Sequence, residues 1–206
     1  MRVSKEKAAQ NRQDILTAAA RLFREQGVSA TGVDAITKDA SLTHGAVYSQ
    51  FGSKEAIATE AIRLALQESR RLWQRLVERN GTKKALPAIV AAYLSRAHCD
   101  APGQGCVVAA LGSEIARQPA SVRNVFTEEL QAGLAFLAEL MPEDTPSRKF
   151  EDAIAVFAGM VGALILARAV NDETLSKRIL QATAERITRQ PEVATPARCA
   201  KRTRPS

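Results

Sequence analysis

The side chains best suited to a chemical task in this sequence lie close together, between Ser41 and Lys54. Amide and hydroxyl groups can form hydrogen bonds with the edges of DNA bases, glutamine mainly with adenine and serine or threonine with several bases. A lysine ammonium at a helix start can bind a phosphate oxygen, assisted by the backbone N–H groups of that helix. The segment therefore indicates DNA binding. The candidate contact residues are Thr43, His44, Gly45, Tyr48, Ser49, Gln50 and Lys54 in this segment, together with Thr31 before it.

Each candidate also has a simpler structural interpretation. The polar side chains can equally form a solvated surface, and Tyr48 can be a core residue. Gly45 either allows close approach to the DNA backbone or is a glycine tolerated near a helix start. Thr31 either donates to a phosphate or caps the helix that follows it. Lys54 either binds phosphate or is a solvated lysine. The distinction depends on which helix faces are exposed.

Three helical segments must position these residues. From Gln10 to Gln26 the apolar residues follow the i, i+3, i+4 spacing of an amphipathic helix, and Gly27 is typical of a helix C-terminus. A second helix is predicted over residues 33–40, followed by a turn at 41–43 and a third helix over 44–51. This order is that of a helix-turn-helix, which places its last helix in the DNA major groove.

The third helix is too short to be stable alone, so packing must hold it in place. Val47 and Phe51 share one face and are predicted to pack on the first helix. The predicted core of this domain consists of Leu22, Phe23, Ile36, Val47 and Phe51.

A much longer helix is predicted next, capped by Ser53 and ending near Asn80. At about 1.5 Å per residue it would be roughly 40 Å long, and it would join the DNA-binding segment to the rest of the chain. Strand-like runs are missing from the sequence, so the predicted fold class is all-α. Further helices are predicted over residues 86–96, 106–117, 121–140, 149–170 and 173–189.

The chain divides into four predicted parts. Residues 1–9 form a basic arm, 10–55 a helix-turn-helix DNA-binding domain, 56–190 a helical ligand-binding and dimerisation domain, and 191–206 a disordered basic tail. Arg12 continues the basic character of the arm. The net charge is +7, but residues 1–60 carry eight basic and seven acidic side chains. The overall charge is therefore weak support for a nucleic-acid partner.

Residues 10–60 resemble the DNA-binding domain of the TetR family of bacterial repressors. The resemblance rests on Gly27, Thr31, the pair Ile36-x-x-x-Ala40, and the pattern Gly45-x-Val47-Tyr48-x-x-Phe51-x-Ser53-Lys54. It favours a phosphate contact for the Tyr48 hydroxyl. His44 stands where this family often has lysine, and Ser49-Gln50 where aromatic or histidine residues are common. The resemblance therefore does not imply an operator sequence.

Proteins of this family are usually homodimers with nine helices per subunit, in which a small molecule bound to the second domain changes the separation of the two DNA-binding domains. The resemblance implies a repressor that binds a pseudo-palindromic double-stranded DNA operator and is released by an effector. The small-residue faces of the helices at about 149–170 and 173–189 are the predicted dimer surface, although they would equally suit a monomer core. Candidate effector contacts, each also a candidate core residue, are Trp73, Tyr93, Phe126, Phe136 and Phe157.

Two cysteines suggest a different trigger. Cys106 stands at the predicted start of a helix, where the backbone dipole stabilises a thiolate, and Cys99 precedes it across a loop. Reversible oxidation or capture of an electrophile is an alternative signal, and the simpler interpretation is a small buried hydrophobic residue. His98 and these cysteines lack the spacing of a metal site, so no metal is predicted.

The sequence also argues against several classes of protein. A nucleophile-histidine-acid set, a glycine-rich phosphate loop and an acidic pair are all missing, so neither enzyme activity nor a cofactor is predicted. The apolar stretch at 153–167 is shorter than the roughly 20 residues of a membrane span, and the N-terminus lacks an apolar leader. A cytoplasmic protein is expected. The other alternative is an adaptor controlled by a protein partner, which a filled core and an exposed apolar patch would favour.

Overall fold

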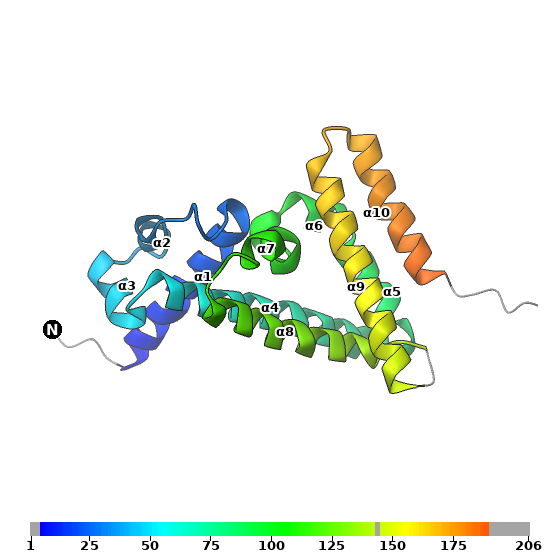
Figure 1. Cartoon of the computed structure of the whole chain (residues 1–206), viewed down its shortest axis with the longest axis horizontal. Coiled ribbons are helices and arrows are strands. Elements are labelled where there is room, and N and C mark those ends of the chain that lie inside the picture. Colours follow the sequence, from blue (N-terminus) through cyan, green and yellow to red (C-terminus); the bar gives the residue numbers. More distant parts are fainter. Residues whose placement is uncertain (1–4, 143–144, 190–206) are drawn as a thin grey trace, which may run out of the picture.

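The structure, a computed structural model, describes residues 5–142 and 145–189. Over these residues it contains α-helices, one short 3₁₀ helix and no strand, which confirms the predicted all-α class. Helices α1–α3 lie at one end of the molecule and α9 and α10 at the other (Figure 1). The elements are α1 (Lys5–Gln26), α2 (Val33–Asp39), α3 (His44–Phe51), α4 (Lys54–Asn80), α5 (Thr82–Tyr93), α6 (Arg96–Asp100), η1 (Pro102–Gln104), α7 (Val107–Ile115), α8 (Ala120–Ala138), α9 (Pro146–Ala169) and α10 (Glu173–Thr188).

Local sequence signals fix the bends between α1, α2 and α3. Gly27 ends α1 with a φ of 88°, in the left-handed region that favours glycine, and its N–H donates to the carbonyl of Phe23 over 2.8 Å. Before α3, the side-chain oxygen of Thr43 accepts a hydrogen bond of 3.3 Å from the N–H of Ala46. The helix-turn-helix layout therefore follows from the turn residues that the sequence supplies.

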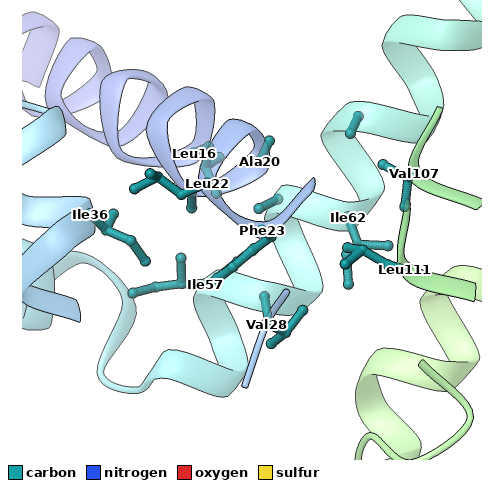
Figure 2. Packing of buried hydrophobic residues seen from close by; sticks show 14 of the residues in the cluster. Leu16, Ala20, Leu22, Phe23, Val28, Ile36, Ile57, Ile62, Val107 and Leu111 are labelled. Carbon is teal, nitrogen blue, oxygen red and sulfur yellow. The ribbon is translucent and has the colours of Figure 1, made fainter. Parts of the chain in front are cut away.

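A first hydrophobic cluster holds α1–α3 against the start of α4. Phe23, Ile36 and Val47 are between 0% and 1% exposed, and Phe51 packs at the edge of the cluster. Figure 2 shows Phe23 of α1 lying against the beginning of α4, near Ile57. These residues confirm the predicted core and the predicted packing of α3 through Val47 and Phe51.

The first cluster also continues into the second domain. Val107, Leu111 and Ile115 of α7 belong to it, together with Val122 of α8. Figure 2 shows Val107 and Leu111 beside Ile62 of α4. Helices α1–α3 and helix α7 therefore share part of one core, so a shift of α7 changes the packing of the helices that support α3.

A second hydrophobic cluster fills the space between the helices of the second domain. It includes Trp73 of α4, Ile89 of α5, Leu137 of α8 and Met160 of α9. In Figure 1, α8 runs alongside α4, and α9 and α10 lie side by side at the far end. Since α4 contributes to both clusters, it is the direct connection between the two domains that the sequence predicts.

The N-terminal boundary of the first helix differs from the predicted one. α1 begins at Lys5 rather than at Gln10, so the described part of the predicted basic arm is helical. The residues before Gln10 are mostly polar but still have good helix propensity. Because the prediction relied on the spacing of apolar residues, it placed the start of the helix too far along the chain. Residues 1–4 of the arm and 191–206 of the predicted tail lie outside the described residues.

The middle of the chain contains one more helix than predicted. The side chain of Ser95 accepts a hydrogen bond of 3.2 Å from the N–H of His98 and starts α6, so α5 ends at Tyr93 and the predicted single helix over 86–96 is wrong. The described residues thus hold ten α-helices where nine were predicted. Pro87 also lies inside α5 rather than in its first turn, because α5 begins at Thr82.

Helix α9 is longer than the uncharged stretch that predicts it. It covers 24 residues and is long and apolar enough, by length and composition, to cross a membrane. The uncharged stretch at 153–167 is still shorter than a membrane span, but the helix extends beyond it because the charged residues near its start do not end the helix. α9 nevertheless packs against α8 and α10, with Phe157, Met160 and Leu164 buried, which is the pattern of a helix in a protein core.

Candidate nucleic-acid interface

Helix α3 presents one face to the core and the opposite face to solvent. Val47 is fully buried, whereas His44, Gly45, Tyr48 and Ser49 are exposed. Positions 45, 48 and 49 follow the i, i+3, i+4 spacing and therefore lie on a single face of the helix. The 45% exposure of Tyr48 excludes its interpretation as a core residue. Major-groove recognition requires a helix that packs on the core through one face and presents a polar face to solvent, and α3 has this geometry.

The hydroxyl groups of Thr43 and Ser49, beside the exposed Tyr48, retain hydrogen-bonding capacity. Thr43 uses its oxygen to cap α3 and keeps its hydroxyl proton, so it can still donate. Ser49 donates its proton to the carbonyl of Ala46 over 2.9 Å and keeps acceptor lone pairs. One hydroxyl is therefore available as a donor and the other as an acceptor, which suits different base edges or phosphate oxygens.

His44 is oriented by an acidic residue that sequence reasoning missed. Its Nδ1 lies 2.8 Å from Oδ1 of Asp34, whose side chain is 93% exposed, and its ring centre lies 4.8 Å from that of Tyr48. Nδ1 is engaged by the carboxylate, so Nε2 is the ring nitrogen that faces other partners. Asp34 lies in the first turn of α2, where a helix dipole favours an acidic side chain, and this position was an available signal.

Lys54 is held at the start of α4 by a specific contact. Its Nζ donates to the carbonyl of Ser29 over 3.1 Å, and the neighbouring Ser53 caps α4 by accepting from the N–H of Ala56 over 3.1 Å. An ammonium group has three protons, so two are left for phosphate oxygens. This anchoring favours the phosphate interpretation of Lys54 over that of a freely solvated lysine.

Thr31 points away from this surface. Its side chain is fully buried, and its hydroxyl donates to the carbonyl of Gly27 over 2.7 Å. Gly32, not Thr31, is the N-cap residue of α2. Both predicted roles of Thr31, as a phosphate contact and as a helix cap, are therefore wrong. A threonine can instead stabilise the turn after a helix by bonding to a nearby carbonyl, and local sequence does not distinguish these uses.

Gln50 also faces inward, so its predicted place on the outer face of α3 is wrong. It lies three residues after Val47 and shares the inner face with it. The side chain is half-buried, and its Nε2 is 3.5 Å from the carbonyl oxygen of Ala8 in α1. Gln50 therefore contributes to the contact between α3 and α1.

Arg12, which the sequence suggested as part of the basic arm, has a structural role. It pairs with Glu60, donates to the carbonyl of Gln50 over 3.0 Å, and lies 4.2 Å from the ring centre of Phe51. One side chain thus joins α1, α3 and α4. Lys54, at the start of α4, is a cation whose anchoring leaves donors free.

The second domain contains a cavity of about 250 Å³ between α4, α5, α6 and α8. Its wall includes the predicted effector contacts Trp73, Tyr93 and Phe157, with ring centres 5.8 Å apart for Trp73 and Phe157 and 6.1 Å apart for Tyr93 and Phe157. Phe126 instead packs against the first hydrophobic cluster, and Phe136 stacks on Trp73 from outside the wall. The nomination of Phe126 and Phe136 as lining residues is therefore wrong.

His98, also in the cavity wall, is fixed as a neutral imidazole. Its Nδ1–H donates to the carbonyl of Tyr93 over 2.6 Å, and its Nε2 accepts from the N–H of Cys106 over 3.0 Å. Burial, together with the positive charge of Arg168, lowers the pKa of His98 against the opposing effect of the bond to Tyr93. The imidazole therefore joins the end of α5 to the start of α7 without carrying a charge at neutral pH.

The hydroxyl of Tyr93 is buried and has no hydrogen-bond partner among the described residues. Burial raises the pKa of Tyr93, and the neighbouring Cys106 raises it further, so the phenol stays protonated. An unpartnered buried hydroxyl costs free energy in the empty protein. It is the type of group that a ligand can satisfy.

Both described cysteines are buried. Cys99 is 5% and Cys106 is 6% exposed, and both are free thiols. Cys106 is the N-cap residue of α7 and lies in the cavity wall, whereas Cys99 does not line this cavity. Their burial favours the interpretation of small hydrophobic residues. Among the residues that the structure describes, no group of three His, Cys, Asp or Glu side chains is arranged to hold a metal ion.

Two contacts that sequence reasoning missed join η1 and α7 to α1 and to the turn that follows it. Arg24 of α1 donates to the carbonyl of Gly103, in the η1 segment next to the cavity, over 2.7 Å, and burial lowers the pKa of Arg24. Glu114 of α7 accepts from the N–H groups of Val28 (2.9 Å) and Ser29 (2.6 Å) and from the Ser29 hydroxyl (2.6 Å). Desolvation alone would raise the pKa of Glu114, but these hydrogen bonds lower it overall.

A family model described as "Bacterial regulatory proteins, tetR family" matches residues 15–61, which cover the second half of α1, all of α2 and α3, and the start of α4. Residues 15–61 therefore match the DNA-binding region of the TetR family, and they make up less than half of the chain. The matched segment includes Tyr48 and Lys54. It leaves the second domain to be interpreted from its own residues.

Two curated relatives each match a segment of this chain. "HTH-type transcriptional regulator AcrR" of Shigella flexneri is 44% identical over 59 residues, which are 29% of this chain and 27% of that protein. "HTH-type transcriptional regulator LmrA" of Bacillus subtilis (strain 168) is 43% identical over 53 residues, which are 25% of this chain and 28% of that protein. The matched segment spans just over a quarter of the length of each relative.

A solved structure extends the likeness to the whole fold. The crystal structure of a TetR-family transcriptional regulator from Agrobacterium tumefaciens has a TM-score of 0.73, covers 88% of this chain and 100% of its own, and is 21% identical in sequence. At this level of identity the likeness establishes the fold alone. The likeness therefore extends beyond the segment that the family model matches.

Proposed function

We propose that this protein is a transcriptional regulator of the TetR family that binds double-stranded DNA through α3. The observation that carries the proposal is the exposed polar face of α3, formed by His44, Gly45, Tyr48 and Ser49 above a buried Val47. A face of this kind matches the requirements of base contact in the major groove. Tyr48 and Lys54 are the proposed phosphate contacts.

The proposed active form is a homodimer. α9 exposes apolar side chains, with Ile154 and Ile165 each 44% and Leu166 56% exposed, and Leu175 of α10 is 43% exposed. Small residues on the same helix allow a second copy of α9 to approach closely. A two-fold dimer through α9 and α10 would carry two α3 helices to half-sites about 34 Å apart or somewhat more, so the operator is a pseudo-palindrome.

The proposed signal is a small molecule that binds in the cavity and releases the protein from DNA, which makes the regulator a repressor. Effectors of this kind act by preferring one conformation, with coupling of typically about 1–3 kcal/mol. α4 lines the cavity and also begins beside α3, so it supports one route of coupling. The contacts of Arg24 with Gly103 and of Glu114 with Ser29 support a second route.

Control by a protein partner is the second candidate. The cavity of about 250 Å³ favours a small molecule, because a partner-controlled adaptor would be expected to have a filled core. The exposed apolar face of α9 is accounted for by the homodimer. The proposed location, where such a regulator meets DNA, is the cytoplasm.

Selection of bound fragments from a random pool of double-stranded DNA tests the proposed function. The full chain is expected to enrich a pseudo-palindromic sequence, since two copies of α3 contact it. A Tyr48→Ala, Lys54→Ala double variant removes the two proposed phosphate contacts and should enrich nothing above the background. Failure of the unmodified chain to enrich any sequence would overturn the proposal.

The roles of individual residues are tested on the selected operator. Ser49→Ala is expected to relax preference at one base position per half-site, by about 1–3 kcal/mol, whereas the inward-facing Gln50→Ala should leave the base preferences unchanged. Lys54→Ala should weaken binding to all sequences alike and reduce the slope of log affinity against log salt by about one. A Gln50→Ala effect on one base position would show that Gln50 turns outward on DNA.

A further inference from the structure

We infer that the cavity of the second domain binds a neutral aromatic molecule of one or two rings that carries a hydrogen-bond acceptor such as a carbonyl oxygen. The inference rests on the proposed function and adds to it the chemical class of the effector. It is carried by three features of the wall: paired charges, one unpartnered hydroxyl group and a set of aromatic rings.

The charges of the wall are already paired. Arg70 donates to Glu129 over 3.0 Å, and Gln67 donates to the other carboxylate oxygen of Glu129 over 2.7 Å. His98 is neutral and uses both ring nitrogens within the protein. A charged ligand would have to enter this space without a counter-ion, because every described ionisable group of the wall is engaged or neutral. Burying an unpaired charge is strongly unfavourable, so the ligand is neutral.

The hydroxyl of Tyr93 supplies the polar contact. Tyr93 lies in the wall, is 6% exposed, and its hydroxyl has no hydrogen-bond partner among the described residues. The Cys106 thiol beside it is at best a weak partner. Since the pKa of the phenol is raised, the hydroxyl keeps its proton and donates. A ligand oxygen that accepts this proton removes the cost of the unsatisfied group.

Aromatic side chains define the shape of the ligand. Trp73 and Tyr93 each pack edge-to-face on Phe157, so their rings form a corner of the wall, and Leu66, Ile89 and Leu134 provide further apolar surface. The cavity volume of about 250 Å³ exceeds the roughly 150 Å³ that accepts benzene and falls below the roughly 300–1,000 Å³ of sites for drug-sized molecules. One or two fused rings fit this space.

Four probes with the same two-ring skeleton separate these features. They are 1-tetralone, a neutral ketone; tetralin, which lacks the acceptor; 1-aminotetralin, a cation; and 1,2,3,4-tetrahydro-1-naphthoate, an anion. Calorimetric titration of the full chain is expected to give the tightest binding for 1-tetralone, about fivefold to tenfold weaker binding for tetralin, and at least about a hundredfold weaker binding for both ions.

Two variants locate the binding. Tyr93→Phe removes only the unpartnered hydroxyl, so the variant should fold normally and bind tetralin with unchanged affinity. It should no longer bind 1-tetralone more tightly than tetralin. Gly133→Leu places a side chain in the cavity, where a Cβ would lie 3.8 Å from Trp73, and it should abolish binding of every probe. Ala132→Leu, an exposed position on the same helix, is the matched control and should have no effect.

The inference is overturned if either ion binds as tightly as the ketone, if the ketone fails to bind at about 1 mM, or if Tyr93→Phe leaves the preference for the ketone unchanged. Release of DNA is measured separately, on the operator obtained by selection. Binding of the ketone without release would uphold the ligand class and overturn effector control. Failure of the selection would instead remove the DNA-binding proposal while the calorimetric result stands.

Discussion

The exposed face of α3 and the cavity of the second domain satisfy their polar groups in opposite ways. On α3, Thr43 and Ser49 each keep an unused hydrogen-bonding site toward solvent, where water occupies it until another partner arrives. In the cavity wall, both carboxylate oxygens of Glu129 and both ring nitrogens of His98 are hydrogen-bonded, and the Tyr93 hydroxyl has no partner within the described part of the chain. An exposed surface can keep many open sites at little cost, whereas a buried wall can keep very few.

The two regions therefore need different structural support in order to bind a partner. Recognition by α3 depends on the helix being held rigidly from behind, because its own eight residues cannot maintain a helix. Recognition by the cavity depends on several helices that enclose it. The contacts of Glu114 and Arg24 join the parts of the chain that hold these regions. Substitutions in the support of α3 should have the largest effect, followed by those on its surface, at these contacts and in the cavity wall.

The largest effect is expected from Phe23→Ala. Phe23 is 1% exposed and lies in the first hydrophobic cluster, so its truncation should lower the free energy of unfolding by about 3–5 kcal/mol. Urea unfolding followed by circular dichroism measures this change. Phe136→Ala, at a partly buried position in the second cluster, is the control and should cost clearly less. A loss below about 1 kcal/mol for Phe23→Ala would contradict its place in the core.

Gly45→Leu should leave the fold intact and weaken DNA binding. A Cβ at Gly45 meets no atom within 4 Å, so the side chain is accommodated in the free protein, but it would project from the face proposed to approach DNA. We expect affinity for the selected operator to fall by roughly tenfold or more, about 1.4 kcal/mol, with an unchanged melting temperature. Gly45→Ala is the smaller control. Unchanged affinity of the leucine variant would mean that this part of α3 does not approach DNA closely.

Glu114→Gln should weaken the connection between the two regions. One amide oxygen cannot replace two carboxylate oxygens that accept from Val28 and Ser29, so we expect a loss of about 1 kcal/mol at neutral pH, limited by solvent exposure. The folded-state pKa of Glu114 is lowered from 4.5, so its contribution is complete above about pH 4.5 and disappears as the pH falls through the folded-state value.

Urea unfolding of the Glu114→Gln variant and the unmodified protein at pH 7 and at progressively lower pH measures this contribution. The two unfolding curves should differ at pH 7 and approach each other in acid. Glu139→Gln, at an exposed position at the end of α8, controls for the loss of a carboxylate. A constant difference at every pH would assign the effect to packing rather than to the charge of Glu114.

The smallest effect is expected from His98→Gln. A glutamine can donate to the Tyr93 carbonyl and accept from the Cys106 N–H, as the neutral imidazole does, but it does not titrate. Because the folded-state pKa of His98 is lowered from 6.5, the unmodified protein should lose stability as the pH falls below 6.5 toward that value. The difference between the melting temperatures at pH 7.5 and pH 5.5 should therefore be larger for the unmodified protein than for the His98→Gln variant. Equal differences would show that His98 does not contribute to the pH dependence.

Local sequence signals correctly predicted most of the helix-turn-helix. Gly27, Thr43 and Ser53 each mark a helix end through backbone conformation or a side-chain cap, and these effects act within a few residues. The same signals were insufficient at Thr31, because a threonine beside a helix can cap it or bond to a carbonyl behind it. They also missed α6, whose cap at Ser95 interrupts a stretch that is otherwise favourable for one helix.

The sequence by itself determined the helical class, the helix-turn-helix and the TetR-family resemblance, because periodicity, capping and turn residues act over short distances. Only the tertiary structure decided that Gln50 faces α1, that Phe126 lies outside the cavity, and that Glu114 and Arg24 connect the two regions. Each of these facts depends on contacts between residues far apart in the chain, which rotate a helix face or bring two segments together after the helices have formed.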